Sequence, residues 1–257
     1  MADTTAPAPA APGASAAVLR TEARLFLREP AALFWIVAFP SLLLTVLGLV
    51  PPFREPSEDL GGLRVIDLYV PVAVLLSTVV AGVQVLPNTL TGYRERGILR
   101  RLSTTPVRPR ALLTAQLALH GATVLVSVVL ALAVGRLAFG VALPEQPLGY
   151  LLALVLTAFA GLALGATVSA LSRTVKIAQT IGTIVFFPAM FTAGVWVPVQ
   201  TMPDLLRRIV ELSPFGAASQ ALDRAAAGEW PAWTHLGLTG LWALLLTCVA
   251  IRWFRWE

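Results

Sequence analysis

The stretch DLYVPVAVLLSTVVAGVQVLPNTLTGYRERGILRRLSTTPVRPRAL, residues 67–112, decides the fold, because a long uncharged run ends abruptly in a cluster of arginines. Residues 68–93 carry no charged side chain, and residues 94–110 then carry six arginines. A helix of about 20 apolar residues crosses the roughly 30 Å hydrocarbon core of a bilayer. The stretch therefore predicts a transmembrane helix followed by a positively charged loop.

The rest of the chain repeats this pattern. Of its 257 residues, 57% are hydrophobic and 13% are charged, whereas a typical soluble domain has about 25% charged residues. Lipid offers the backbone no hydrogen-bond partners, so apolar segments of this length are expected to be helices. We predict an all-α membrane protein with six spans, near residues 31–50, 67–90, 111–138, 148–171, 177–198 and 232–251.

The charges between the spans predict the orientation of the bundle, because cytoplasmic loops are enriched in Lys and Arg close to the span ends. With the N-terminus inside, 13 of the 19 basic residues fall on the cytoplasmic side. The other six fall outside, together with nine acidic residues. Both termini are therefore predicted to be cytoplasmic. This topology explains the net charge of +5 without a nucleic-acid partner.

The N-terminal region is predicted to contain a tail and a short helix. Residues 1–15 are rich in Ala and Pro and are expected to be disordered, which leaves residues 16–257 as one transmembrane domain. Within residues 16–30, arginines recur at every fourth position opposite apolar side chains. This spacing indicates an amphipathic helix lying flat on the inner membrane surface, with a plain cytosolic linker as the alternative.

The arginine cluster also has helical order, although its charge alone would fit an ordinary cytoplasmic loop. At 100° per residue, Ile98, Leu99 and Leu102 fall on one side together with Glu95, and arginines occupy the other side. The pattern indicates a short amphipathic helix that Pro106 helps to end before the third span. Such a helix can lie on a membrane or bind a groove of a partner protein. The acid on the apolar side favours a protein partner.

The outer loop between the fifth and sixth spans contains two further helical patterns. They cover residues 203–212 and 215–227, on either side of Pro214. Both are too short to cross a bilayer and too apolar for a free loop. We predict two re-entrant or interfacial helices that cap the outer end of the bundle.

Two groups of residues in these segments resemble the signature of type-2 ATP-binding-cassette (ABC) transporter permeases. In the outer loop they are Ala193-Gly194, Pro198, Met202-Pro203, Pro214 and Arg224. In the arginine cluster they are Glu95-Arg96-Gly97, Leu99, Leu102 and Thr105-Pro106-Val107. With the flat first helix and the six spans, the resemblance extends over nearly the whole chain from about residue 16. It is closest to the compact bacterial drug and antibiotic exporter permeases.

The resemblance implies a division of labour between subunits. The helix after the second span would be a coupling helix that docks into a cleft on a separate ATPase, with Glu95, Arg96, Gly97, Leu99, Arg101, Leu102 and Pro106 as the coupling residues. Gly194, Pro198, Pro203 and Pro214 would shape the outer re-entrant region. Two permease copies, expected to form a homodimer, would enclose the substrate path in a bacterial plasma membrane above two ATPase copies.

The chain itself is expected to have no catalytic residue and to bind no cofactor or metal. A phosphate-binding loop needs glycines and a lysine, and the single lysine of the sequence, Lys176, follows no glycine-rich loop. No His, Cys and acid cluster has the spacing of a metal site. ATP and Mg²⁺ are therefore expected on the partner ATPase, and this chain is not expected to be an enzyme.

Several polar and aromatic residues inside the spans are candidates for the substrate path. They are Gln84, Asn88, Gln179, Phe187 and Phe191. The aromatic residues suit a hydrophobic or amphiphilic small molecule, such as a drug, an antibiotic or a lipid-like compound. Polar side chains also join helices through hydrogen bonds, and aromatic residues also anchor spans at the membrane surface. An ion- or proton-coupled secondary carrier and a non-transporting scaffold for a cytosolic partner remain as alternative functions.

Overall fold

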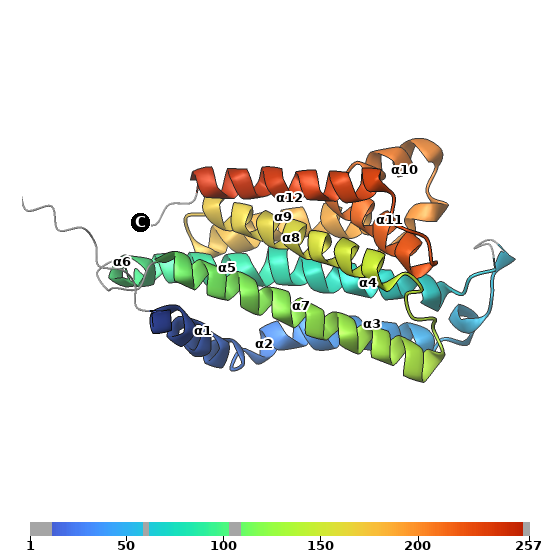
Figure 1. Ribbon diagram of the computed structural model, residues 1–257, viewed down its shortest axis with the longest axis horizontal. Helices are drawn as coiled ribbons and strands as arrows, with labels where there is room; N and C mark the ends of the chain where they lie inside the picture. The colour runs from blue at the N-terminus through green and yellow to red at the C-terminus, as the bar shows by residue number, and fades with distance from the viewer. Residues whose placement is uncertain (1–11, 59–61, 103–108, 254–257) are drawn as a thin grey trace, which may run out of the picture.

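The structure, a computed structural model, describes residues 12–58, 62–102 and 109–253, which are helical and contain no strand. Six helical segments are long and apolar enough to cross a membrane, and they confirm the six predicted spans. In chain order, spans 1 to 6 are Pro30–Gly48, Val65–Glu95, Ala111–Phe139, Pro147–Leu171, Val175–Thr192 and Trp233–Trp253. They lie side by side along the long axis of the molecule (Figure 1).

The first two spans are not continuous α-helices. Span 1 consists of α2 (Pro30–Leu33), the π-helical η1 (Phe34–Ala38) and α3 (Phe39–Gly48). Span 2 consists of α4 (Val65–Val79), the π-helical η4 (Val80–Val85) and α5 (Leu86–Glu95). The other four are α7 (Pro109–Phe139), α8 (Pro147–Leu171), α9 (Val175–Thr192) and α12 (Trp233–Trp253). Span 5 is shorter than predicted, because its helix ends at Thr192 and Gly194 then takes a φ of +82°.

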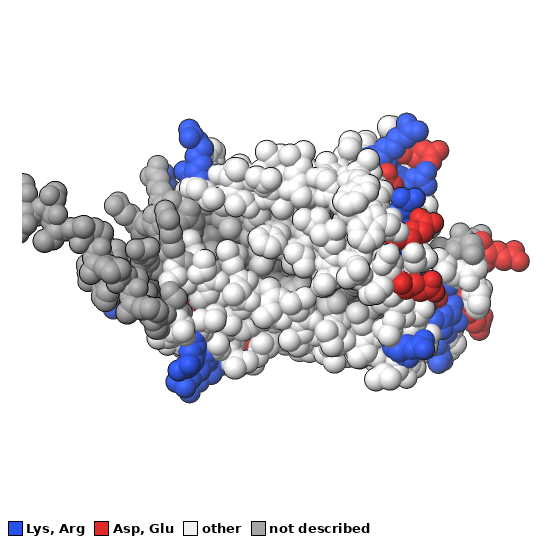
Figure 2. All heavy atoms as spheres, viewed as in Figure 1, with Lys and Arg blue, Asp and Glu red and all other residues white. Residues whose placement is uncertain are grey.

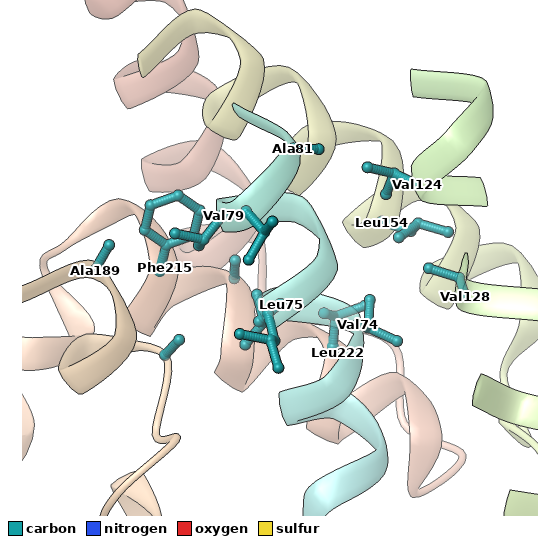
Figure 3. Close-up of a cluster of buried hydrophobic side chains, with 14 of the residues drawn as sticks. Val74, Leu75, Val79, Ala81, Val124, Val128, Leu154, Ala189, Phe215 and Leu222 are labelled. Atoms are coloured by element: carbon teal, nitrogen blue, oxygen red, sulfur yellow. The ribbon is translucent and has the colours of Figure 1, made fainter. Parts of the chain in front are cut away.

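Span 2 is the centre of the core. Val74, Leu75 and Val79 of α4 are fully buried against side chains from α7, α8, α9 and α11 (Pro214–Ala226). In the close-up, Phe215 and Leu222 of α11 point into this cluster (Figure 3). Burial of these side chains fixes span 2 inside the bundle, so the other spans are arranged around it.

Spans 2 and 4 approach each other so closely that their backbones touch. A Cβ atom built on Gly165 would lie 1.8 Å from the backbone oxygen of Gly82, and one on Gly82 would lie 2.2 Å from the oxygen of Gly161. Both distances are far below van der Waals contact, so no side chain fits at these positions. The small residues of span 4 therefore set the distance between the two helices.

The shorter helices lie at the two ends of the bundle. α1 (Pro12–Phe26) and α6 (Ile98–Leu102) are at one end, called the inner end after its predicted orientation. α10 (Asp204–Glu211) and α11 are at the opposite, outer end, with the 3-10 helices η2 (Pro51–Arg54) and η5 (Val199–Thr201). On the face shown in Figure 2, charged side chains gather at both ends, most of the acids are at the outer end, and the middle is almost free of charge.

The N-terminal prediction needs a correction at its boundary. α1 already begins at Pro12, so residues 12–15, which were assigned to the tail, are helical. The rest of the predicted tail, residues 1–11, lies outside the described residues. α1 is a helix packed along α7, which excludes the plain linker. Its position on the membrane surface stays a prediction.

Both predicted outer helices are present, but they differ in burial. α10 is largely exposed, with Leu205 75% and Ile209 59% accessible. α11 is enclosed by α4, α8 and α12, and its Phe215 and Leu222 are fully buried. α11 is thus an integral part of the bundle, whereas the sequence predicts only a helix that caps the outer end.

Candidate functional site

The predicted coupling helix is shorter than the helical order of the sequence indicates. α5 ends at Glu95, and Gly97 takes a φ of +66° before α6 begins at Ile98. This left-handed conformation is unfavourable for residues with a side chain, and it ends helices. The prediction of one helix that carries Glu95 and the leucines on a common face is therefore wrong. Glu95 belongs to the end of span 2, and Arg96 and Gly97 form the turn.

α6 turns its apolar side toward its own bundle. Leu99 is 1% exposed, so it holds α6 in place and is not part of a surface that a partner could contact in this conformation. Within residues 95–101 the exposed side chains are Arg96, Arg100 and Arg101, together with Glu95. α6 ends at Leu102, whose side chain lies outside the described part of the chain, as does Pro106. The surface offered to a partner is therefore mainly basic.

The end of span 2 is tied to the turn between α8 and α9 by two neighbouring residues of opposite charge. The Nη2 atom of Arg94 donates to the backbone oxygens of Ser169, at 2.8 Å, and of Ser172. The Oε1 atom of Glu95 accepts from the backbone N–H of Val175 at 3.1 Å. We call Arg94, Glu95 and these backbone groups the span 2 clamp.

Each charge of the span 2 clamp lies at the helix end that stabilises it. Ser169 and Ser172 are at the C-terminus of α8, where the helix dipole is negative, and Arg94 is positive. Val175 is the first residue of α9, where the dipole is positive, and Glu95 is negative. The clamp lies at the end of span 2, two residues before α6 begins.

A buried carboxylate fastens α1 to spans 2 and 3. Glu22, 8% exposed, accepts at Oε2 from the hydroxyl of Tyr93 at 2.5 Å and from Nε2 of Gln116 at 2.6 Å. Phe26 packs against the ring of His120 with their centroids 5.1 Å apart. α1, span 2 and span 3 are therefore joined at the inner end. Glu22 was not identified from the sequence, and Arg94 was assigned only to the polar side of the amphipathic helix, because no local pattern indicates which helix a single charged residue will meet.

The candidate path residues do not form one site. Gln84 and Asn88 line a groove of about 430 Å³ between spans 1, 2 and 5. Gln179 and Phe187 lie on the exposed side of α9, where Phe187 stacks on Trp196 with ring centroids 6.0 Å apart. Phe191 packs at the outer end against the cluster formed by Val199, Met202 and Val210.

The predicted outer residues each begin or end a structural element. Gly194 makes the turn after span 5, and Pro198 directly precedes η5. Pro203 precedes α10, and Pro214 is the first residue of α11. The structure thus places each of these residues at the boundary of an element, and their part in a re-entrant region stays a prediction. Its depth in the membrane stays a prediction.

Asp223 joins η5 to α11 at the outer end. Its Oδ2 atom accepts from Nε2 of Gln200 at 2.6 Å and lies 3.5 Å from the hydroxyl of Ser219. Burial raises the pKa of Asp223 from 3.8 to about 7, although its two hydrogen bonds act in the opposite direction. The hydroxyl of Tyr150 stands close enough to Asp223 to interact with it electrostatically.

The raised pKa predicts that the protein becomes less stable as pH rises. The folded state holds the proton on Asp223 more tightly than the unfolded state, so its stabilising effect is full below about pH 4 and is lost between about pH 4 and pH 7. Because the side chain is partly exposed, we expect deprotonation of Asp223 to lower the melting temperature by only about 2 °C. Melting curves of the detergent-solubilised protein across this range should show a smaller fall for Asp223→Asn. The exposed Asp204→Asn serves as the control, and equal slopes for all three proteins would contradict the assignment.

We compared the sequence with those of known proteins and of protein families. Residues 15–224 match the family model described as ABC-2 type transporter. The matched segment begins in α1, contains the span 2 clamp and α6, and ends at Arg224 in α11. No curated protein sequence matches the chain.

Proposed function

The chain belongs to the ABC-2 type transporter family, and we propose that it exports a hydrophobic or amphiphilic small molecule from a bacterial cell with energy from a separate ATPase. Family membership makes it a transmembrane permease component of an ABC transporter and implies an ABC ATPase partner and a membrane location. The proposal adds the direction, the substrate type and the bacterial plasma membrane. It also adds an assembly of two identical permease copies with two ATPases that bind ATP and Mg²⁺.

The observation that carries the proposal is the arrangement of the inner end. The basic residues Arg96, Arg100 and Arg101 are exposed there, and α6, which carries Arg100 and Arg101, is held against the bundle by Leu99. A rigidly held basic surface suits a partner with an acidic cleft, because complementary charge speeds docking and fixes its orientation. Docking on the ATPase would therefore be mainly electrostatic.

Force applied at this surface has two routes into the bundle. Through the span 2 clamp it reaches the ends of α8 and α9. Through Glu22, Tyr93 and Gln116 it reaches α1 and span 3. ATP binding would draw the two ATPases together, α6 would follow, and the spans tied to it would tilt and open the path.

Reversing the three exposed charges should abolish assembly. We expect Arg96→Glu, Arg100→Glu and Arg101→Glu in one chain to weaken the association with the ATPase at least about tenfold, because attraction becomes repulsion. The measurement is the dissociation constant between permease nanodiscs and the purified partner ATPase, with ATPase stimulation as a second readout.

The control reverses three exposed arginines that lie away from the inner end, Arg54, Arg136 and Arg208. It should bind the ATPase like the unaltered chain. Melting curves of both variants separate lost docking from lost folding. An inner-end variant that folds and still binds normally would overturn the docking surface. Transport driven by a proton gradient in the absence of any ATPase would favour a secondary carrier.

A further inference from the structure

The groove between spans 1, 2 and 5 has the size of a small-molecule site. Its volume is about 430 Å³, within the range of roughly 300–1,000 Å³ that is usual for such sites. Glu29 and Trp35 come from the start of span 1, Gln84 and Asn88 from span 2, and Phe186 from span 5. Glu29 directly precedes Pro30, the first residue of span 1, so the groove begins at the inner end of the bundle and leads into it.

Spans 1 and 2, the two main walls of the groove, each line it in part with a π-helical segment. Trp35 lies in the π-helical η1, and Gln84 lies in the π-helical η4. η1 and η4 contact each other. π-Helical turns are rare and occur frequently at functional sites. Two of them meeting at one groove are an independent indication that this part of the bundle binds a ligand.

Two polar groups of the groove, Glu29 and Asn88, offer hydrogen-bond acceptors to a ligand. Glu29 is the one charged residue that lines it, and its carboxylate makes no hydrogen bond or ion pair with any residue in the described ranges. The Nδ2 atom of Asn88 donates to the backbone oxygen of Gln84 at 2.6 Å. Its Oδ1 atom is buried and finds no donor among the described residues. The hydroxyl of Thr89 donates to the oxygen of Val85 at 3.3 Å.

These acceptors lie beside apolar aromatic surface. Trp35 and Phe186 offer rings to the body of a ligand, and aromatic faces also attract cations. A neutral ligand would leave the carboxylate of Glu29 partly desolvated and unpaired, which is unfavourable. An anion would be repelled. A ligand that satisfies Glu29 and the Oδ1 atom of Asn88 carries a positive charge and N–H donors on an apolar body.

We propose that this groove binds an organic cation, a protonated amine on an aromatic or aliphatic body. The ammonium group is held by Glu29 at the inner mouth, within reach of the acceptors farther in, and the body lies between Trp35 and Phe186. In the predicted orientation this mouth lies at the inner leaflet, whose anionic lipids attract such cations. That the bound cation is then exported rests on the proposed function, whereas its binding does not.

Three probes with one aromatic body and different charges test the site. They are 1-pyrenemethylamine, 1-pyrenemethanol and pyrene-1-carboxylate. The full chain is placed in nanodiscs of phosphatidylcholine, and binding is measured as the probe retained beyond that of empty nanodiscs. We expect the amine to bind about tenfold more tightly than the alcohol, and the carboxylate to bind most weakly.

Glu29→Gln should weaken binding of the amine about tenfold and leave binding of the alcohol unchanged, because only the amine forms the charge-assisted contact. Trp35→Ala should weaken both. The control Glu55→Gln removes an exposed acid that lies outside the groove and should change neither. Equal binding of the amine to Glu29→Gln and the unaltered chain, or equal binding of the three probes, would overturn the proposal.

Adding the ATPase distinguishes a failure of the site from a failure of the proposed function. Glu29-dependent binding of the amine that never stimulates an associated ATPase would contradict export and support the site. Export of the three probes at equal rates, with no effect of Glu29→Gln, would support the exporter and overturn the site. Stimulation by the amine that Glu29→Gln abolishes would support both.

Discussion

Replacing Arg94 with methionine is expected to uncouple the ATPase from transport while leaving the two proteins bound to each other. Arg94 is half-buried and donates to two backbone oxygens at the C-terminus of α8. Methionine keeps much of the apolar stem and removes the donors and the charge. A hydrogen bond to a charged group stabilises by about 1.5–3 kcal/mol, so loss of both should release the end of span 2 from the turn between α8 and α9.

The expected result is at least about a tenfold fall in probe export per ATP hydrolysed, since a change of about 1.4 kcal/mol in coupling is tenfold. Export and ATP hydrolysis are measured together in proteoliposomes that contain the permease and its ATPase. Spin labels at Arg100 and Lys176, in a chain with Cys248→Ser, should report a broader distance distribution between α6 and the start of α9.

The matched control for Arg94→Met is Arg136→Met, which changes an exposed arginine at the far end of α7. It should leave both readouts unchanged. Glu95→Gln tests the other half of the span 2 clamp and should act in the same direction with a smaller effect, because its amide oxygen still accepts from Val175. Unaltered coupling in Arg94→Met, with the labels as close as before, would refute transmission through the clamp.

Replacing Gly165 with alanine is expected to be among the most destabilising single changes in the chain. The added Cβ would stand 1.8 Å from the backbone oxygen of Gly82, which has no flexible side chain to move aside. Spans 2 and 4 would have to separate, and the core around Val79 would open. Overpacking usually costs about 1–3 kcal/mol, and we expect this substitution to cost about 3 kcal/mol or more.

The free energy of unfolding in mixed micelles is the measurement for Gly165→Ala. Gly237→Ala is the matched control, because nothing lies within 4 Å of a Cβ atom built at that position of α12. It should be neutral or slightly stabilising, since alanine is the better helix former. If both variants unfolded alike, the close contact between spans 2 and 4 would not limit stability.

Much of the fold follows from local sequence properties. A run such as residues 68–93 must hide its backbone polar groups in a helix if lipid surrounds it, so the six spans could be located from apolar length alone. Proline and glycine then mark where elements begin and end, as Pro214 does for α11 and Gly194 for the end of span 5. The π-helical turns η1 and η4 escaped prediction, because they depend on packing between spans.

The candidate site was less predictable than the fold. The sequence indicated that the residues next to Gly97 form a candidate site, but it did not predict the role of each residue. Helical phase placed Glu95 and Leu99 on one partner-facing side, and the left-handed turn at Gly97 separates them. Gln84 and Asn88 were identified as path residues and share a groove, whereas Glu29, which gives that groove its charge, has no sequence pattern that distinguishes it.

The sequence by itself determined that this protein crosses the membrane six times and carries a basic segment after its second span, because length, hydropathy and charge are properties of each segment alone. Only the tertiary structure decided that Arg94 and Glu95 grip two different helix ends, that Glu22 holds α1 to the bundle, and that Glu29 stands beside Trp35 and Phe186. These contacts join segments that lie far apart in the chain. Which side chains meet depends on how the spans rotate and pack, and in a bilayer that is set by close contacts such as Gly82 against Gly165.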